Sequence, residues 1–158
     1  MSLLHNNETF PHLEIAAVGG GTITLPSDLA GSFGVVLAYR GSWCPYCRAQ
    51  LASFSRAMDK FADQDIKVIA LSVDDEATSA ALVAKHNLSF PVGHSVNAGE
   101  FAGATGAYTN DDPNYIQSTG FVLAPDGTIV TAVYSSGAIG RLVPDDVLGL
   151  IAYIKSNV

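Results

Sequence analysis

Runs of apolar residues alternate along the chain with apolar stripes of helical spacing. The runs at 35–39 and 66–73 are rich in β-branched residues, which is typical of buried strands. Between them, apolar side chains recur at spacings of four, three, four and three residues, at Cys47, Leu51, Phe54, Met58 and Phe61. Because these spacings place side chains on one face of a helix, we predict a helix that holds the cysteines in its first turn and runs to about Ala62.

The same alternation continues on both sides of this unit. Residues 19–31 predict a short strand after a glycine turn. Asp74 or Asp75 is expected to cap a helix that ends near His86, because a short polar side chain accepts the free amide hydrogens of a first turn. A shorter strand is expected within 88–94.

The last third of the chain changes from alternation to a hairpin. Asn97 is expected to cap an Ala- and Gly-rich helix, which is followed by a turn-rich loop at 109–115. A Pro-Asp-Gly turn at 125–127 joins two strand patterns and predicts a hairpin. Pro144 then begins a helix with an apolar stripe and two acidic residues in its first turn.

Strands that alternate with helices, followed by a hairpin and a final helix, predict an α/β fold. The expected architecture is a three-layer sandwich, in which helices cover both faces of a mixed central sheet. No repeat, low-complexity tract or linker divides the chain, so we expect one domain over 1–158.

Charge and hydropathy exclude two classes of partner. The chain has a formal charge of −7 and only eight Lys and Arg residues, so it lacks the basic surface that tracks phosphates, and no nucleic acid is expected. The opening residues lack the basic segment and apolar run of a secretory signal. Every apolar run is far shorter than the ~20 residues that span a bilayer. We therefore expect a cytoplasmic protein that does not contact a membrane.

Cys44 and Cys47 are the only cysteines, and they lie three residues apart at the predicted start of a helix. Residues at this spacing lie about 5–6 Å apart, so the pair can interconvert between dithiol and disulfide. The helix N-terminus favours negative charge, which makes Cys44 the expected attacking thiolate. Pro45 suits the first helical position and stiffens the turn.

Two non-catalytic roles are the alternatives for these cysteines: ligands of a structural zinc ion, or buried residues of the hydrophobic core. A structural zinc needs four ligands, and the chain has no other cysteine and no histidine pair at metal spacing, so no metal is expected. A core role fits Cys47 in part, because it falls on the apolar stripe. No nucleotide or flavin motif is present, and no cofactor is expected.

Several neighbours are candidates for supporting roles. Arg40 and Arg48 could stabilise a thiolate or polarise a peroxide oxygen, or could simply be solvated. Trp43 and Tyr46 are expected to be partly exposed, both packing the loop and offering a flat surface to a substrate. The four histidines are expected to be structural or surface residues rather than acid–base catalysts. The segment that contains Tyr108 and Tyr115 could line a substrate cleft, but a solvated loop is the expectation.

The segment WCPYC at 43–47 resembles the active site of thioredoxin-like oxidoreductases, and its CPYC core is similar to that of glutaredoxins. The wider frame, from GGGTITLPSDLAGSFGVVLAYRG through the cysteine helix to SFPVGHS and GFVLAPDGTI, resembles the peroxiredoxin-like proteins of the alkyl hydroperoxide reductase and thiol-specific antioxidant family. This resemblance implies a thioredoxin-like fold and a thiol-dependent peroxidase. It also implies a peroxide or disulfide substrate and reduction by a thioredoxin or glutathione system.

The resemblance allows two uses of the same cysteines. In the peroxidase use, Cys47 takes the peroxidatic position and forms a sulfenic acid, and Cys44, at the family's threonine position, condenses with it to a disulfide. In the thioredoxin use, Cys44 attacks a substrate disulfide and Cys47 resolves the mixed disulfide. A redox-responsive binding module is a third hypothesis. A homodimer is the assembly that the resemblance suggests, and the sequence does not identify the oligomeric state.

The chain departs from the family pattern at several positions. Arg40 stands where peroxiredoxins usually have a proline, and Gln50 stands where many have a glutamate. Ser118 lies near the place of a catalytic arginine in peroxiredoxins and of a cis-proline in thioredoxins, and is a further candidate for site support. Ala38 replaces the buried acid of many thioredoxins. Arg141 would supply the positive charge of the family's catalytic arginine if the fold brings it near the cysteines, although a surface position is expected for it.

Overall fold

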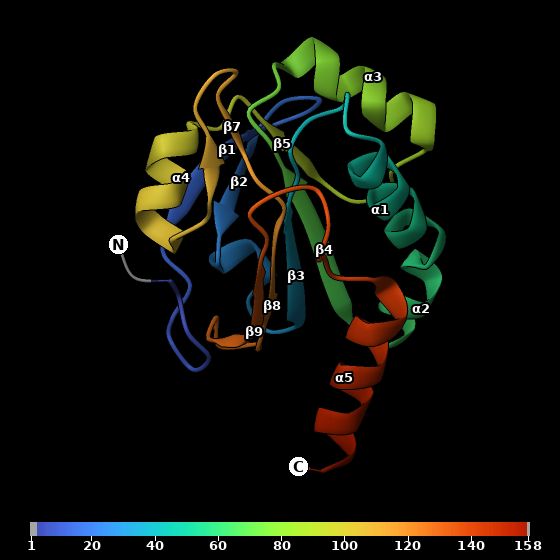
Figure 1. Ribbon diagram of the computed structural model, residues 1–158. Coiled ribbons are helices and arrows are strands. Elements are labelled where there is room, and N and C mark those ends of the chain that lie inside the picture. Colours follow the sequence, from blue (N-terminus) through green and yellow to red (C-terminus); the bar gives the residue numbers. More distant parts are fainter. Residues whose placement is uncertain (1–2, 158) are drawn as a thin grey trace.

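The computed structural model describes residues 3–157, which fold around a central sheet (Figure 1). The strands are β1 (Leu13–Ala17), β2 (Thr22–Leu25), β3 (Phe33–Ala38), β4 (Ile66–Leu71), β5 (Val92–His94), β6 (Thr109–Asn110), β7 (Tyr115–Ile116), β8 (Thr119–Leu123) and β9 (Ile129–Tyr134). The helices are η1 (Ser27–Leu29), α1 (Pro45–Arg56), α2 (Met58–Asp63), α3 (Glu76–His86), α4 (Ala98–Thr105) and α5 (Pro144–Ser156).

Seven of the strands within residues 3–157 form one mixed sheet in the order β2-β1-β5-β4-β3-β8-β9. Strands β3, β4 and β5 run parallel to one another, and the other pairs are antiparallel. The predicted mixed sheet and the predicted hairpin, which is β8–β9, are confirmed. Strand β3 lies inside the sheet, and its carboxyl end leads into the loop that carries the cysteines.

Residues of β3, together with Tyr39 directly after it, alternate between two apolar layers. Val35, Leu37 and Tyr39 pack into the layer beneath α1, α2, α3 and α5. Val36 and Ala38 pack into the opposite layer, which includes residues of α4. Figure 1 shows the same division, with α4 on one side of the sheet and the other α-helices on the other. The predicted three-layer sandwich is therefore confirmed.

The structure differs from the predicted elements in three places. The helix expected to continue to Ala62 breaks at Ala57, whose backbone (φ −93°, ψ 2°) leaves helical geometry and separates α1 from α2. Strand β1 was not predicted, because Ile15 is its only buried residue and the strand is held by pairing with β2 and β5. The loop at 109–115 contains part of a short ladder, β6–β7.

Among residues 3–157, no helix combines the length and the apolar character that crossing a membrane requires.

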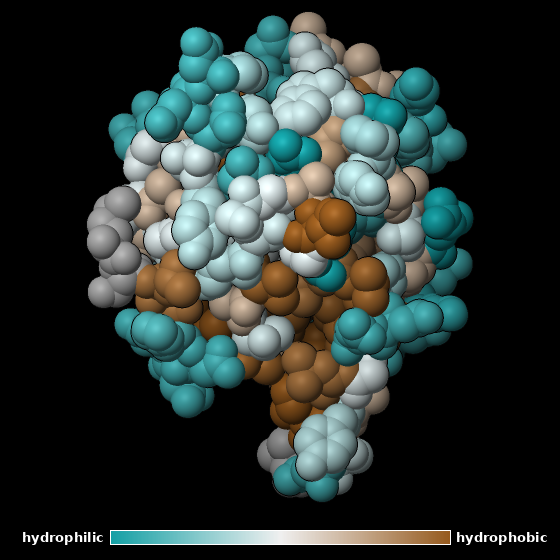
Figure 2. Space-filling view, viewed as in Figure 1, coloured by the Kyte–Doolittle hydropathy of each residue, from teal (hydrophilic) through white to brown (hydrophobic). Residues whose placement is uncertain are grey.

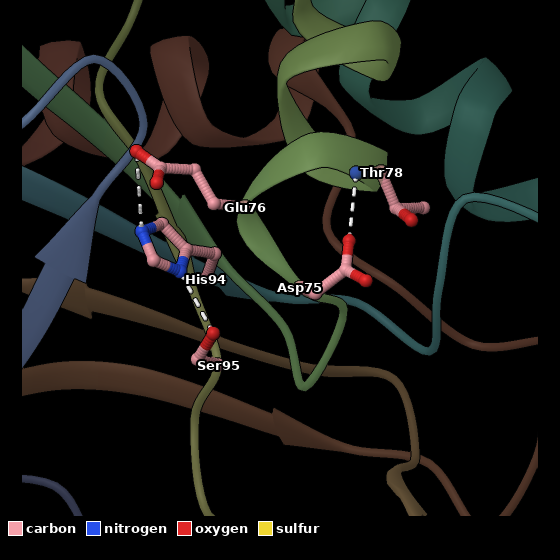
Figure 3. A network of polar contacts seen from close by, with 5 residues as sticks. All are labelled: Asp75, Glu76, Thr78, His94 and Ser95. Carbon is pink, nitrogen blue, oxygen red and sulfur yellow. Dashed lines mark hydrogen bonds and ion pairs between the residues drawn. The ribbon is translucent and has the colours of Figure 1, made fainter.

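Polar side chains cap the helices at the predicted positions. Asp75, rather than Asp74, caps α3 by accepting a hydrogen bond from the backbone N–H of Thr78 (2.8 Å). Asn97 caps α4 in the same way through Glu100 (3.0 Å). Figure 3 shows the α3 cap beside His94, whose ring lies between Glu76 and Ser95.

Replacing Asp75 with alanine is expected to lower the melting temperature at neutral pH. The hydrogen bond from Thr78 lowers the pKa of Asp75 below its ordinary value of 3.8. A folded-state pKa below the unfolded-state value contributes stability that is complete above the ordinary value and is lost as the pH falls through the lowered one. Thermal melts of Asp75→Ala and of the exposed loop variant Asp111→Ala should therefore differ at neutral pH and converge in acid. A constant difference at every pH would contradict this cap.

Helix α1 is anchored to the sheet by Leu51 and Phe54, both fully buried. Phe54 stacks on Phe61 of α2 with ring centroids 5.5 Å apart. Replacing Phe54 with alanine removes a fully buried aromatic ring, and we expect this to lower the free energy of unfolding by about 3–5 kcal/mol. Urea denaturation measures this loss. The exposed change Lys60→Ala is the control and should stay within about 0.5 kcal/mol of the parent.

Candidate active site

The two cysteines lie in the first turn of α1, at the carboxyl edge of the parallel strands. Cys44 is the N-cap residue and Pro45 the first helical residue, as predicted. The Sγ of Cys44 accepts a hydrogen bond from the backbone N–H of Cys47 (3.3 Å), so a sulfur fills the place that a hydroxyl or carboxylate usually fills at a helix N-terminus. Both cysteines are free thiols and fully buried.

Cys47 faces an arginine from the far end of the sequence. The backbone N–H of Arg40 donates to the Cys47 Sγ (3.4 Å), and the Arg141 Nη2 lies 3.7 Å from the same sulfur. Gln50, one turn along α1, accepts a hydrogen bond from the Arg141 Nη1 (2.7 Å) and donates to the Leu142 carbonyl (2.9 Å). The Ala138 carbonyl accepts from the Arg141 Nε (3.0 Å). These contacts fix the guanidinium beside the sulfur.

Cys44 faces a second arginine. The Nη1 of Arg40 lies 3.7 Å from the Cys44 Sγ, its Nε donates to the Gln117 Oε1 (3.0 Å), and its Nη2 donates to the Tyr115 hydroxyl (3.0 Å). The guanidinium carbon also lies 4.9 Å from the ring centroid of Trp43 and 5.2 Å from that of Tyr115. Aromatic rings attract a cation at this range, so the two rings and three hydrogen bonds hold Arg40 in one position.

The two thiols ionise unequally. Burial alone would raise the pKa of Cys44, but hydrogen bonds from Cys47 and Arg40, together with the charge of Arg141, outweigh burial and lower this pKa below its ordinary value. Burial raises the pKa of Cys47, and the hydrogen bond to Cys44 raises it further. The pair therefore carries its first negative charge on Cys44.

The apolar surface near the site gathers around the loop that precedes α5 and along the side of that helix facing the sheet (Figure 2). Ile139 and Val143, both exposed, lie in this loop beside Arg141. Trp43 and Tyr46 are about half exposed at the cysteine turn (50% and 54%), in agreement with the partial exposure expected for them. Exposed apolar or aromatic side chains thus lie both on the cysteine turn and on the loop that holds Arg141.

A comparison with models of protein families identifies the family to which this chain belongs. The family model described as "AhpC/TSA family" matches residues 7–132, well over half of the chain. The chain belongs to the AhpC/TSA family. This peroxiredoxin, a thiol-dependent peroxidase with a thioredoxin-like fold, matches the family resemblance seen in its sequence.

Similar proteins cover nearly the whole chain. Alkyl hydroperoxide reductase C of Mycobacterium tuberculosis is 26% identical over 99% of this chain and 88% of its own length. A peroxiredoxin of Thermotoga maritima is 24% identical over 95% of this chain and 71% of its own length. Among solved structures, Mycobacterium tuberculosis AhpC superposes with a TM-score of 0.83 at 24% identity, covering 99% of this chain and 96% of that chain. At this identity the structural match shows the shared fold.

The structure corrects the expected surface position of Arg141. The expectation was wrong because Gln50 reaches across to this arginine and holds it at Cys47. A sequence signal did exist: Gln50 is a polar residue beside the apolar stripe of α1, and a buried side-chain amide requires a hydrogen-bonding partner.

The peroxiredoxin also brings together residues expected in a solvated loop. Tyr115 is buried and bonds to Arg40, so its expected solvated position was wrong. Gln117, which sequence reasoning missed, bonds to the same guanidinium. Tyr115 and Gln117 are two residues apart, which is the spacing of side chains on one side of an extended segment, and this was the available signal. Tyr108, in contrast, is about half exposed.

Two candidates for site support have other hydrogen-bonding partners. The Nη1 of Arg48 donates to the Ser42 carbonyl (3.0 Å), which ties α1 to the preceding loop. Ser118 directly precedes β8, and its carbonyl accepts from the backbone N–H of Ser135 (3.0 Å). Within residues 3–157, no hydrogen bond joins either side chain to a cysteine sulfur. A direct role for either residue therefore stays a prediction.

Proposed function

We propose that this peroxiredoxin reduces peroxides through a disulfide cycle within its CxxC motif. Cys47 thiolate attacks the peroxide, the O–O bond breaks, and the sulfur becomes a sulfenic acid while the peroxide leaves as water or an alcohol. Cys44 thiolate then attacks the Cys47 sulfur, a disulfide forms and hydroxide leaves. Two thiols are oxidised and one peroxide is reduced in each turn.

The main support for this proposal is the pair of hydrogen-bond donors at the Cys47 sulfur. The backbone N–H of Arg40 and the guanidinium of Arg141 both point at its Sγ, at 3.4 and 3.7 Å. Such donors stabilise the negative charge of an attacking thiolate and of the oxygen that leaves. Cys44 is one helical turn away and already hydrogen-bonded to Cys47, so resolution needs no distant cysteine.

Burial favours peroxide over a protein disulfide as the oxidising substrate. Both cysteines are fully buried, and hydrogen peroxide is little larger than water, whereas a protein disulfide must bring its own chain to the attacking sulfur. Thiol–disulfide exchange at Cys44 is a second candidate function, favoured by the lowered pKa of this thiol at the helix N-terminus. Reduction of a model disulfide protein, lost in Cys44→Ser, would distinguish it.

The oxidised pair needs an external thiol to return to the dithiol. We propose a thioredoxin or glutathione system in a reducing, cytoplasmic compartment as this reductant. A solved yeast mitochondrial 1-Cys peroxiredoxin shares the fold with a TM-score of 0.82, and its thiol resolving mechanism is described as acting through glutathione/thioredoxin systems. A homodimer and a redox-responsive binding role stay predictions.

The cycle is tested by adding one equivalent of hydrogen peroxide to the fully reduced protein under argon, followed by alkylation and mass spectrometry. We expect a disulfide between Cys44 and Cys47 within one chain, seen as the loss of two hydrogens and of both alkylation sites. Thioredoxin or glutathione should then restore both sites. A stable sulfenic or sulfinic acid in the parent protein, or a disulfide between two chains, would contradict the cycle.

A further inference from the structure

The site pairs two arginines with two sulfurs, Arg141 with Cys47 and Arg40 with Cys44. Arg141 is held by a glutamine and a carbonyl, and Arg40 by a glutamine and a tyrosine hydroxyl, all of them uncharged. Among residues 3–157, neither guanidinium has a carboxylate within ion-pair distance. Two partly buried cations without a carboxylate partner favour an anion between them, and the dithiol is the group that supplies one.

We propose that Arg40 holds the negative charge of the dithiol on Cys44, which makes Cys44 first the base that takes the proton of Cys47 and then the nucleophile that closes the disulfide. This inference rests on the proposed peroxide cycle and adds the origin of its proton transfer. It also assigns to Arg40 a role at the resolving sulfur that is separate from the role of Arg141 at the attacking one.

The position of Arg40 supports a role specific to Cys44. All three guanidinium nitrogens are engaged, and the ring faces of Trp43 and Tyr115 lie against it, so the charge is fixed at the Cys44 sulfur. The charged or titratable groups that face Cys44 are Arg40 from the loop after β3, Cys47 from α1, and Arg141 from the loop before α5. Of these, Arg141 is bonded to Gln50 and lies at Cys47, which leaves Arg40 as the cation in contact with Cys44.

The proton and the charge balance through the whole reaction. The thiol proton of Cys47 moves to the Cys44 thiolate, whose Sγ also accepts the backbone N–H of Cys47, and Cys47 becomes the thiolate. When Cys47 attacks the peroxide, the leaving alkoxide or hydroxide takes the proton from Cys44. Cys44 is then a thiolate again and attacks the sulfenic sulfur, releasing hydroxide. One peroxide and one monoanionic dithiol thus give one disulfide, one alcohol or water, and one hydroxide.

The charge on Cys44 is tested without peroxide. In a Cys47→Ser background, the rate of iodoacetamide alkylation of Cys44 is followed against pH, alone and combined with Arg40→Met, Arg40→Lys or the control Arg56→Met. Arg56 is exposed at the far end of α1 and its replacement changes the net charge equally. We expect Arg40→Met to slow alkylation at neutral pH about tenfold, equivalent to a shift of one pKa unit, and Arg40→Lys to restore part of the rate. Identical profiles for Arg40→Met and Arg56→Met would overturn the inference.

A second measurement tests the role of Arg40 in resolution with both cysteines present. Excess peroxide should drive Cys47 of Arg40→Met to sulfinic acid, because a slower Cys44 leaves the sulfenic acid open to a second peroxide, whereas Arg56→Met should stop at the disulfide. Equal sulfinic acid in the two variants, with folding verified by circular dichroism, would also overturn the inference. If alkylation depends on Arg40 but peroxide oxidises neither cysteine, the proposed function fails while the charge assignment stands.

Discussion

Replacing Cys47 with serine is expected to abolish peroxide consumption. A serine hydroxyl has the shape of the thiol but is far less acidic and cannot form a sulfenic acid, so the attack on the O–O bond is lost. The measurement is the disappearance of hydrogen peroxide in the presence of excess reductant. The variant should match the rate without protein, while its melting temperature stays near that of the parent.

Cys44→Ser is the control variant for Cys47→Ser. It keeps the attacking sulfur, Arg141 and the Arg40 backbone donor, so Cys47 should still be oxidised once. Without Cys44 the sulfenic acid cannot be resolved within the motif, and dimedone should label Cys47. Peroxide consumption by Cys47→Ser at the rate of the parent, or dimedone labelling of Cys44 in that variant, would show that the two sulfurs have the opposite roles.

Replacing Arg141 with methionine is expected to lower the rate constant for peroxide reduction by about 100-fold or more. Removing one preorganised donor from the charge that develops in a buried site costs a factor of this size. Stopped-flow fluorescence of Trp43, the single tryptophan, can follow the oxidation of the adjacent pair. The alkylation profile of Cys44 should change less, since Arg141 lies at Cys47 and Arg40 lies at Cys44.

Replacing Gln50 tests the role of Arg141 indirectly. It does not touch a sulfur through any hydrogen bond described within residues 3–157, but it holds Arg141 through a contact of 2.7 Å. Gln50→Leu should lower the peroxide rate less than Arg141→Met, and combining the two should add little to Arg141→Met alone, because both remove the same interaction. Full additivity of the two losses would contradict a joint role.

The sequence was informative where the pattern of one segment decides its structure. The β-branched runs and the stripe of α1 predicted β3, β4 and the helix with the cysteines, and local side chains predicted the caps at Asp75 and Asn97. Strand β1 could not be predicted because its pattern leaves only Ile15 buried, and partners distant in sequence hold it in the sheet.

In the candidate site, too, the sequence predicted the residues that are adjacent along the chain and not those that distant contacts bring together. Cys44, Pro45 and Cys47 are adjacent in sequence, and their spacing alone placed them in one helical turn. Arg141 reaches the Cys47 sulfur through a contact that spans 94 residues, and Tyr115 reaches Arg40 through one that spans 75, so no local pattern could place them. Their signals were the hydrogen-bonding needs of Gln50 and of Arg40, which become specific only when the fold brings the partners together.

Peroxidase function at Cys47 is tested most directly by the rate at which the reduced protein reacts with hydrogen peroxide, compared with free cysteine at the same concentration of thiolate. We expect a rate constant well above that of free cysteine, lost in Cys47→Ser and strongly reduced in Arg141→Met. A rate no faster than that of free cysteine, together with rapid mixed-disulfide formation at Cys44, would contradict it and would make thiol–disulfide exchange the function of the motif.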